Sequence, residues 1–414
     1  MTEQAKVPAI RFAGFTDPWE QRKLGDVASS FDYGLNAAAT EYDGQNKYLR
    51  ITDIDDETHE FSKSDLTTPL ADLAMSADYL LKEGDLLFAR TGASVGKTYL
   101  YRQFDGMVYF AGFLIRARIG EGADPEFAYQ ATLTDAYKKY VAITSQRSGQ
   151  PGVNAQEYAD YQLMLPSKTE QQQIGMTLRS LDDLITLHQR KYDKLVILKK
   201  SMLEKMFPKD GESVPEIRFA GFTDPWEQRK LSEVATFGGG HTPPMADPDN
   251  YEDGYVLWVT SQDVKSNYLD RTTTQITEKG AKELTLYPAG SLVMVTRSGI
   301  LRHTLPVAEL RKPSTVNQDI HVILPQGECC GEWLLQFFIS HNKELLLEFG
   351  KTGTTVESVD FGKIKDMLLY MPSTVEQQQI GDFFAKLDSL ITLHQRKLEL
   401  LQNIKKSLLD KMFV

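Results

Sequence analysis

The residues best suited to chemistry in this chain lie in polar, glycine-containing loops. The stretch GASVGKT at residues 92–98 resembles a phosphate-binding loop, in which backbone N–H groups and a lysine cradle phosphate oxygens. That loop needs four residues between its glycines, and only three separate Gly92 from Gly96. We therefore do not expect this chain to bind ATP.

A second possibility is a nuclease-like group of carboxylates. Pro248-Asp249, followed by Asp263-Val264-Lys265, has the spacing with which nucleases gather carboxylates and a lysine around Mg²⁺. The corresponding stretch of the first half, Asp53-Ile54-Asp55, lacks the lysine. An adenine-methyltransferase motif is also absent, since TPPM at 242–245 is only a poor match to [ND]PP[YF]. No Ser/His/Asp or Cys/His set stands out, so the chain is expected to catalyse no reaction itself.

Two loops in each half have side chains that suit the bases and phosphates of DNA. Arg and Lys can bond bidentately to guanine, Gln to adenine, and Ser or Thr to bases or phosphates. Ordinary polar turns are the alternative interpretation, and the similar placement of the loops in both halves favours DNA contact. The candidate DNA-binding residues are Arg90, Thr91, Ser94, Lys97, Gln146, Arg147, Ser148, Gln150, Arg297, Ser298, Arg302, His303, Lys351, Thr352 and Thr354.

Each pair of loops is attached to a set of β-rich runs and a helix. In the first half we predict strands at residues 48–54, 84–90, 97–102 and 107–119, and a helix at 125–143. The second half has counterparts at 255–264, 290–297 and 314–324, and a helix at 331–349. The order is the same, so we predict that both heads share one fold with diverged sequences.

An internal duplication explains this order. Residues 8–24 and 215–231 are identical at 16 of 17 positions, and residues 166–207 and 372–413 at 26 of 42. The segments between these ends, 25–165 and 232–370, show little identity. We therefore expect a first head with its leader (1–165), a central helix (166–207), a linker (208–214), a second head with its leader (215–371) and a distal helix (372–414).

The duplicated 42-residue segments have the pattern of long helices. Ser167 and Ser373 each precede a glutamate by three residues, as in a capping box. Apolar or seam residues then recur at steps of four and three, a heptad stripe typical of a coiled coil. The expected seam comprises Ile174, Leu181, Ile185, His188, Leu195, Ile380, Leu387, Ile391, His394 and Leu401.

The nearest partner for each helix is its own duplicate, so we predict an antiparallel pair related by a pseudo-twofold axis. A helix of this length would extend roughly 60 Å at 1.5 Å per residue. His188 and His394 lie near the helix midpoints, and we expect them to face each other and fix the register. A metal site there, or a role in binding a partner subunit, is the alternative.

Charge argues against a general polyanion binder. The net charge is −11, with 12 basic and 21 acidic residues over 25–165 and 12 and 18 over 232–370. Phosphate contacts need Lys and Arg, so a few placed cations, with help from partners, would have to bind DNA. The two cysteines, Cys329 and Cys330, are adjacent and predict no disulfide, and no segment resembles a signal peptide or a membrane span, which favours a cytoplasmic protein.

Over essentially its whole length the sequence resembles the specificity subunits of Type I restriction–modification systems. The resemblance rests on the helix starts LPSKTEQQQI and MPSTVEQQQI, the leader PEIRFAGFTDPWEQRKL and the strand–loop GDLLFARTGASVGK. It implies an α+β protein with two similar α/β target-recognition domains separated by an antiparallel coiled coil. The second head departs from the first at the RTGASVGK loop, which weakens the transfer of contacts to Arg297, Arg302 and His303.

The resemblance also implies partners. It implies a complex with double-stranded DNA and two modification subunits that methylates adenine with S-adenosylmethionine, and restriction subunits that cleave DNA using ATP and Mg²⁺. No cofactor, metal or membrane contact is expected for this chain. A stand-alone two-headed DNA-binding protein and a coiled-coil scaffold with protein-binding heads are the alternatives.

Overall fold

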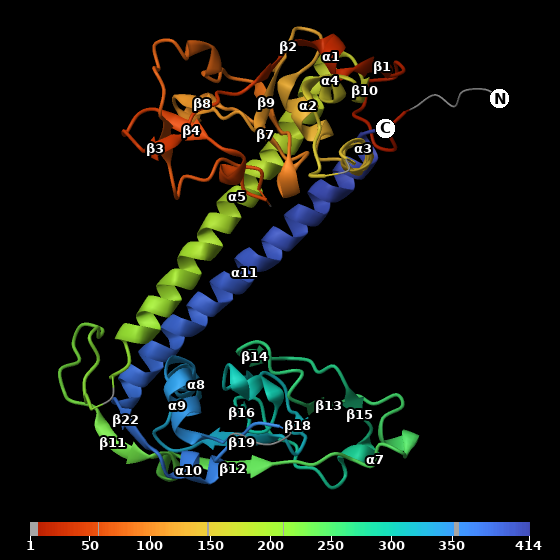
Figure 1. Ribbon diagram of the computed structural model, residues 1–414. Helices are drawn as coiled ribbons and strands as arrows, with labels where there is room; N and C mark the ends of the chain where they lie inside the picture. The colour runs from red at the N-terminus through yellow and green to blue at the C-terminus, as the bar shows by residue number, and fades with distance from the viewer. Residues whose placement is uncertain (1–6, 57, 147–148, 210, 352–355) are drawn as a thin grey trace. The chain divides into compact units, whose positions relative to one another are not determined.

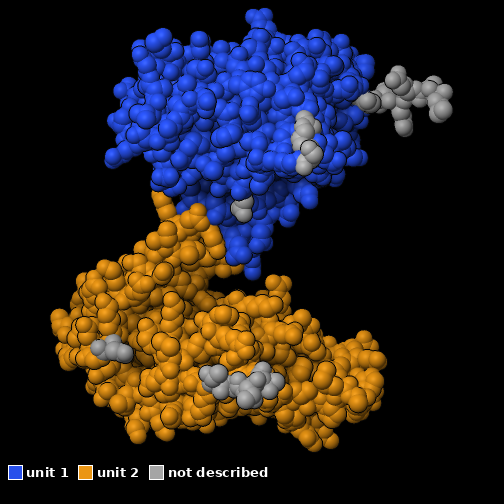
Figure 2. All heavy atoms as spheres, viewed as in Figure 1, with its two compact units in different colours: residues 1–191, 394–414 blue, residues 192–393 orange. Residues whose placement is uncertain are grey.

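The computed structural model describes residues 7–56, 58–146, 149–209, 211–351 and 356–414. The chain forms two compact units, coloured separately in Figure 2. Unit 1 comprises residues 1–191 and 394–414, and unit 2 comprises residues 192–393. Each unit therefore combines the head of one copy with segments of both long helices.

Head one is built on a four-stranded sheet of order β2-β9-β6-β7, formed by β2 (Ala28–Tyr33), β9 (Leu114–Ile119), β6 (Asp85–Ala89) and β7 (Thr98–Leu100). Two smaller pairs join it: β3 (Ala39–Glu41) with β5 (Thr67–Pro69), and β4 (Lys47–Leu49) with β8 (Val108–Phe110). The helices are α1 (Leu24–Val27), α2 (Pro125–Ala131), α3 (Asp135–Thr144) and α4 (Ala155–Ala159). Helix α2 packs beside β6 and β7 (Figure 1).

Head two repeats this arrangement. Its main sheet has the order β12-β19-β16-β17-β14, with β12 (Ala235–Gly239), β19 (Ile320–Pro325), β16 (Leu292–Val295), β17 (Val307–Leu310) and β14 (Tyr268–Leu269). Further strands are β13 (Val256–Val259), β15 (Gln275–Ile276), β18 (Thr315–Val316), β20 (Gly350–Lys351) and β21 (Ser358–Val359). The helices are α6 (Leu231–Val234), α7 (Glu278–Ala281), α8 (Gly331–Ser340), α9 (Asn342–Phe349) and α10 (Phe361–Asp366). The prediction of one shared fold is confirmed by the first four strands of each order.

Apart from Asp85 at the start of β6, the central strand of each head is apolar because both of its faces are buried. In β6, Leu86 and Phe88 enter one hydrophobic core, while Leu87 and Ala89 enter another. The residues of β16 alternate between two cores in the same way. A strand covered on both sides has a continuous apolar sequence rather than an alternating one.

The predicted elements are present but are more broken than the sequence indicated. The helix predicted at 125–143 divides into α2 and α3, because the Thr134 side chain accepts a hydrogen bond from the backbone N–H of Tyr137 and caps a new helix. The strand predicted at 107–119 divides into β8 and β9. The run 48–54 is only partly a strand, since residues Ile51–Asp53 form a 3₁₀ turn.

The identical leaders attach each long helix to its head. Strand β1 (Glu20–Lys23) pairs with β10 (Gln162–Leu165), and β11 (Glu227–Lys230) pairs with β22 (Leu368–Met371). The Arg11 guanidinium donates two hydrogen bonds, of 2.7 and 2.8 Å, to the buried carboxylate of Glu170. Arg218 binds Glu376 in the same way. The duplicated ends therefore form the same anchor in both units.

Helices α5 (Lys168–Lys205) and α11 (Thr374–Met412) begin where the duplicated segments predict. The backbone N–H of Glu170 donates to Ser167 Oγ, and that of Glu376 donates to Ser373 Oγ, which satisfies one free donor of each first turn. The glutamate carboxylates, however, are bound by the leader arginines. The expected capping pattern thus also serves as the anchor for the leader.

The end of each helix completes the core of the unit that contains the other copy's head. Met412, at the end of α11, is buried in the core of head one, and the Phe413 ring stacks on Phe127 at 5.0 Å between ring centroids. Met206 and Phe207 are correspondingly buried in the core of head two. Because these aromatic and aliphatic side chains are fully part of each core, neither head is complete without the other copy's helix end.

Contacts between α5 and α11 show antiparallel pairing within each unit. In unit 1, Asp182 forms an ion pair with Lys405, and His188 Nδ1 lies 2.7 Å from His394 Nδ1. In unit 2, the same ion pair recurs as Asp388 with Lys199, 206 residues along from the first pair. The predicted fold class, with an antiparallel pair of long helices from an internal duplication, is confirmed.

Three of the predicted seam residues also belong to the cores of the heads. Ile174 and Ile380 are buried in the cores of heads one and two, and Leu387 belongs to the core of head two. Helix α5 approaches head one closely at Gly175, where a Cβ would lie 3.1 Å from the Phe127 backbone nitrogen. These clusters also include residues of the partner helix, Leu408 with Ile174 and Leu195 with Leu387, so the start of each helix packs in its own head without leaving the neighbourhood of the other helix.

The histidine pair should make stability depend on pH. A hydrogen bond between two Nδ1 atoms needs one donor and one acceptor, so two imidazolium rings cannot form it. Burial, the neighbouring ring and the cations Lys397 and Lys191 lower the pKa of His188, and burial and the same two lysines lower that of His394. Unfolded histidine binds protons near pH 6.5, so this contribution is present above that pH and is lost as pH falls through the lower folded values.

We compare the wild-type chain with a His188→Leu/His394→Leu variant. The difference between their melting temperatures, wild type minus variant, should decrease by a few degrees when the pH is lowered from 7.5 to 5.5. Thermal unfolding at several pH values measures this difference. His241→Gln, at an exposed histidine, is the control and should leave the pH profile unchanged. A difference between wild type and double variant that does not vary with pH would contradict the role of the pair.

Candidate nucleic-acid interface

The two loops predicted in each head are brought together by backbone hydrogen bonds. In head one, the N–H of Val153 donates to Arg90 O at 2.9 Å, and that of Gly92 donates to Pro151 O at 3.0 Å. In head two, Val359 N–H donates to Thr296 O at 3.0 Å, and Ser298 N–H to Glu357 O at 3.1 Å. Each head therefore holds two segments side by side. In head one the loop after β6 lies beside the segment that follows α3, and in head two the loop after β16 lies beside the segment that follows α9.

The arginines of these loops are not equivalent, although the sequences RTG and RSG suggest it. In the sheet of head one, Ala89 pairs with Leu114. In the sheet of head two, Val295 pairs with Ile320, and each of these residues lies 206 positions after its counterpart in head one. The same offset places Thr296, not Arg297, at the position of Arg90. Consecutive side chains on an extended strand point to opposite faces, so the two arginines leave their strands in different directions.

Arg90 differs from the other arginines of head one. Among the described residues 7–165, it is the only arginine without a carboxylate partner. The other pairs are Arg11–Glu170, Arg22–Glu20, Arg50–Asp53, Arg102–Glu126, Arg116–Asp32 and Arg118–Asp85. Its guanidinium carbon instead lies 5.1 Å from the centroid of the Tyr33 ring. A guanidinium on an aromatic face keeps its in-plane N–H groups available.

Head two shows the same exception. Within the part of residues 215–371 that the structure describes, Arg297 alone among the arginines has no carboxylate partner. The other pairs are Arg218–Glu376, Arg229–Glu227, Arg271–Asp270, Arg302–Glu357 and Arg311–Glu309. Among the described residues of this acidic chain, each head thus has one arginine without a carboxylate partner, and the two arginines follow equivalent strands, β6 and β16.

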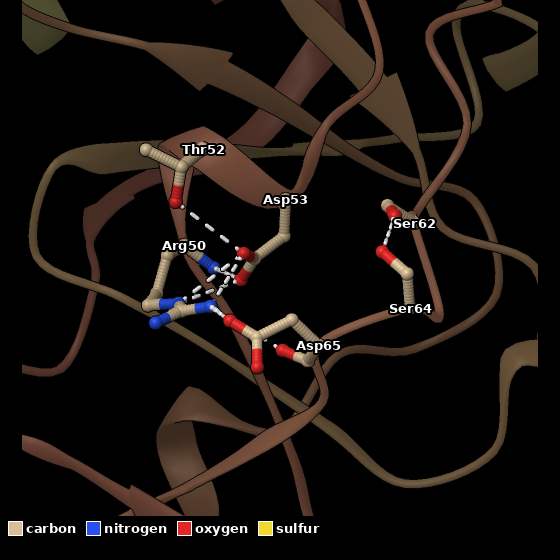
Figure 3. A network of polar contacts seen from close by, with 6 residues as sticks. All are labelled: Arg50, Thr52, Asp53, Ser62, Ser64 and Asp65. Atoms are coloured by element: carbon tan, nitrogen blue, oxygen red, sulfur yellow. Dashed lines mark hydrogen bonds and ion pairs between the residues drawn. The ribbon is translucent and has the colours of Figure 1, made fainter.

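Arg50, which follows β4 in head one, shows what a paired guanidinium does. Arg50 is held by the carboxylate of Asp53, with Asp65 on its other side (Figure 3). Asp53 also accepts the backbone N–H of Arg50 at 2.8 Å. In head two, Asp263 accepts the backbone N–H of Thr260 at the same distance. These aspartates stabilise a turn that the two heads share.

The nuclease-like spacing noted in head two corresponds to separate structural contacts. Asp263 is bound by Thr260 and Thr273, whereas Asp249 forms an ion pair with Lys279 at 3.0 Å. Among the described residues there is no group of three or more His, Cys, Asp or Glu side chains that could hold a metal ion. In the same part of the chain, no helix is both long enough and apolar enough to cross a membrane.

Lys97 is engaged within head one. Its ammonium donates to Ile54 O at 2.9 Å and forms an ion pair with Asp56, and its side chain is only 11% exposed. The preceding Gly92–Ser94 forms a 3₁₀ turn. The lysine of GASVGKT therefore fixes the loop to the turn after β4, which does not fit a phosphate cradle.

The remaining predicted residues differ in how they are held. Ser94 is half-buried, Gln146 and Gln150 are exposed, and Thr91 Oγ1 donates to Pro151 O. In head two, His303 is exposed, while Ser298 Oγ accepts the N–H of Ile300. Arg147, Ser148, Thr352 and Thr354 lie outside the described residues.

Two predicted cations of head two form surface ion pairs. Arg302 binds Glu357, and Lys351 lies 2.8 Å from Asp360. Hydrogen bonds from these cations lower the pKa of Glu357 and of Asp360. Both cations are more than half exposed, at 64% and 60%. Their carboxylate partners are less exposed, at 13% for Glu357 and 24% for Asp360, so the cation is the more accessible member of each pair.

Sequence reasoning missed the aromatic residues beside Arg90. Tyr33 is 44% exposed, and Phe113, whose carbonyl accepts the Arg90 N–H, is 58% exposed. Phe113 lies in the run 107–119, which is predicted as one strand, whereas no element is predicted at Tyr33. The sequence signal available was a neighbouring glycine: Gly34 follows Tyr33 and Gly112 precedes Phe113, and glycine in such a run often marks a break in a strand.

The engaged position of Lys97 yields a stability prediction. Replacing Lys97 with Met removes a largely buried ammonium from Ile54 O and Asp56, so we expect the free energy of unfolding to fall by about 1–3 kcal/mol. Chemical denaturation measures the change. Lys82→Met, at an exposed lysine of the same head, should change stability by less than about 0.5 kcal/mol. Equal effects of the two substitutions would show that the Lys97 contacts do not stabilise the head.

Comparison with known proteins agrees with this duplicated architecture. Residues 16–196 and 223–403 each match the family model described as "Type I restriction modification DNA specificity domain". The chain is 30% identical over 166 residues to the EcoR124I/EcoR124II specificity subunit of Escherichia coli, covering 40% of this chain and 41% of that protein. It is 27% identical to the MjaIX specificity subunit of Methanocaldococcus jannaschii over 46% of this chain and 44% of that one. The chain thus spans less than half the length of these two relatives.

Longer matches are more distant. The MjaVIII specificity subunit of M. jannaschii is 20% identical over 95% of this chain and 92% of its own. The crystal structure of the Type I restriction–modification S subunit from M. genitalium superimposes with a TM-score of 0.67 over 99% of both chains at 13% identity, which shows a shared fold. With two copies of the domain covering most of its sequence, the chain belongs to the Type I restriction–modification DNA specificity family.

Proposed function

We propose that the chain is the subunit that determines the DNA sequence specificity of a Type I restriction–modification complex. Each head would read one half of an asymmetric, two-part site on double-stranded DNA. The observation that carries this proposal is the unpaired arginine of each head, Arg90 and Arg297, at the junction of two polar loops. Arginine is the side chain that most often recognises DNA bases specifically.

We choose the remaining candidate DNA contacts by whether each side chain can leave its present contacts within the protein. Arg302 and Lys351 have mostly exposed side chains that can contact a phosphate, and Ser94, Gln146, Gln150 and His303 lie in the same loops. Lys97 is excluded from our set of DNA contacts because breaking its buried contacts would cost more than a phosphate contact gains. Its role is to hold the Arg90 loop in place.

The heads should read different half-sites. Their loops share a backbone arrangement, yet the arginine is displaced by one residue, and the facing segments differ in sequence. The same backbone with different side chains can dock on DNA similarly while contacting different base edges. The DNA site would therefore be asymmetric even though the ends of the two copies are duplicated.

We further propose that α5 and α11 set the spacing of the half-sites and bind two modification subunits, which methylate adenine with S-adenosylmethionine. Restriction subunits would add cleavage that depends on ATP and Mg²⁺. Apolar side chains exposed on the helices support a binding role; they include Leu184, Leu187, Ile197 and Leu400. In this proposal the chain itself is non-catalytic and acts in the cytoplasm.

Exchange of one head provides the test. The chain is expressed with the modification subunit of its system, and methylated sites are mapped across the host genome. Replacing residues 25–165 with the head of another family member should change one half of the methylated sequence and leave the other half and the spacer unchanged. The matched exchange of residues 232–370 should change only the opposite half.

Other outcomes would reject the proposal. Methylation without sequence preference by the wild-type complex would contradict a specificity role. Failure of the chain to copurify with the modification subunit, combined with site-specific binding by the chain alone, would indicate a stand-alone DNA-binding protein. Loss of both half-sites on exchange of one head would show that the heads do not act separately.

A further inference from the structure

Arg90 is held by its surroundings more firmly than an unpaired surface arginine usually is. Its backbone N–H donates to Phe113 O at 3.1 Å, and its carbonyl accepts from Val153 N–H at 2.9 Å. Its guanidinium lies over the Tyr33 ring. Strand β2, the turn before β9 and the segment after α3 therefore hold the side chain and the backbone of this residue, so less conformational entropy remains to be lost on binding.

Tyr33 is itself fixed. Its hydroxyl accepts the backbone N–H of Ala155 at 3.2 Å, at the start of α4, and the residue is the last of strand β2. The ring uses the face of the guanidinium and leaves the in-plane N–H fork free. A rigid fork with two parallel donors matches the O6 and N7 acceptors of guanine, whereas a flexible cation suffices for a phosphate.

The charge around Arg90 also favours a base over the backbone. Head one has 21 acidic and 12 basic residues over 25–165, and its other described arginines are paired. A phosphate-tracking surface needs several free cations side by side. One preorganised guanidinium, held over the Tyr33 ring, instead suits a single base edge.

We propose that Arg90 is a specificity-determining residue of head one, which recognises a guanine in the major groove of its half-site, and that Tyr33 is its positioning residue. This inference rests on the proposed function. It names the base that the site takes, and it separates Arg90 from Arg297, which is displaced by one residue along the equivalent strand and meets a different part of its own half-site.

Substitution of Arg90 in the complex with the modification subunit tests the proposal. Arg90→Ala should relax one guanine position of one half-site to several bases, with roughly a 5- to 150-fold loss of discrimination at that position. The other half-site should not change. Arg90→Lys should relax the same position, because lysine keeps the charge but not the bidentate fork.

The tyrosine variants separate positioning from folding. Tyr33→Phe keeps the ring and should preserve the methylated sequence, whereas Tyr33→Ala should relax the same guanine position as Arg90→Ala. Arg297→Ala is the matched control and should affect only the opposite half-site. Binding to duplexes that differ only at this guanine, measured at two salt concentrations, gives a readout independent of the extent of methylation.

Several results would overturn the inference while leaving the proposed function intact. One is a wild-type recognition sequence without guanine in either half. Another is an Arg90→Ala complex whose recognition sequence is unchanged while affinity for all duplexes falls, or an Arg90→Lys complex that retains full discrimination, either of which would indicate a phosphate contact. If the Arg90→Ala chain does not assemble with the modification subunit, the recognition sequences of the Arg90→Lys and Tyr33→Ala complexes test the inference instead. Absence of any recognition sequence in the wild-type complex would instead reject the proposed function.

Discussion

The structure depends on the pairing of a long helix with its own duplicate. Each compact unit contains a head, the first part of that copy's helix and the last part of the other's. Met412 and Phe413 pack in the core of head one and Met206 and Phe207 in that of head two, so each head would lose part of its core without this exchange. The antiparallel pairing is therefore part of the folding of each head.

This dependence explains which parts of the sequence are duplicated almost unchanged. The leader supplies Arg11 or Arg218, the helix start supplies Glu170 or Glu376, and the helix end supplies the aromatic side chain that enters the other core. Each of these groups must fit a partner that comes from the other end of the unit or from the other copy. The segments between them need only preserve the sheet and its cores, so their surfaces are free to diverge.

The sequence predicted the large-scale fold because helices and repeats have strong local patterns. The helix starts at Ser167 and Ser373, the shared strand order and the facing histidines all follow from spacing along the chain. It failed where tertiary contacts decide. Thr134 interrupts a continuous apolar pattern by capping α3, and Ile174 is also part of the core of head one, which its heptad position does not indicate.

The candidate interface was predictable only as a set of loops. RTG and RSG look equivalent in sequence, but the sheet pairing shows that Arg90 corresponds to Thr296. Lys97 looked free and is largely buried, because its partners Ile54 and Asp56 lie about 40 residues earlier in the chain. Which cations are available depends on the acidic residues near them in space, and the sequence does not contain that information locally.

The acidic charge of the heads and the scarcity of unpaired arginines are two aspects of one arrangement. A surface with many free cations binds any DNA, and its non-specific affinity competes with the target across a whole genome. Pairing most arginines with carboxylates lowers that background, so that the few preorganised contacts account for a larger share of the binding free energy. Such a subunit would bind weakly by itself and would depend on its partners for phosphate contacts. Discrimination between sequences would then come from the heads, and most of the affinity from the assembled complex.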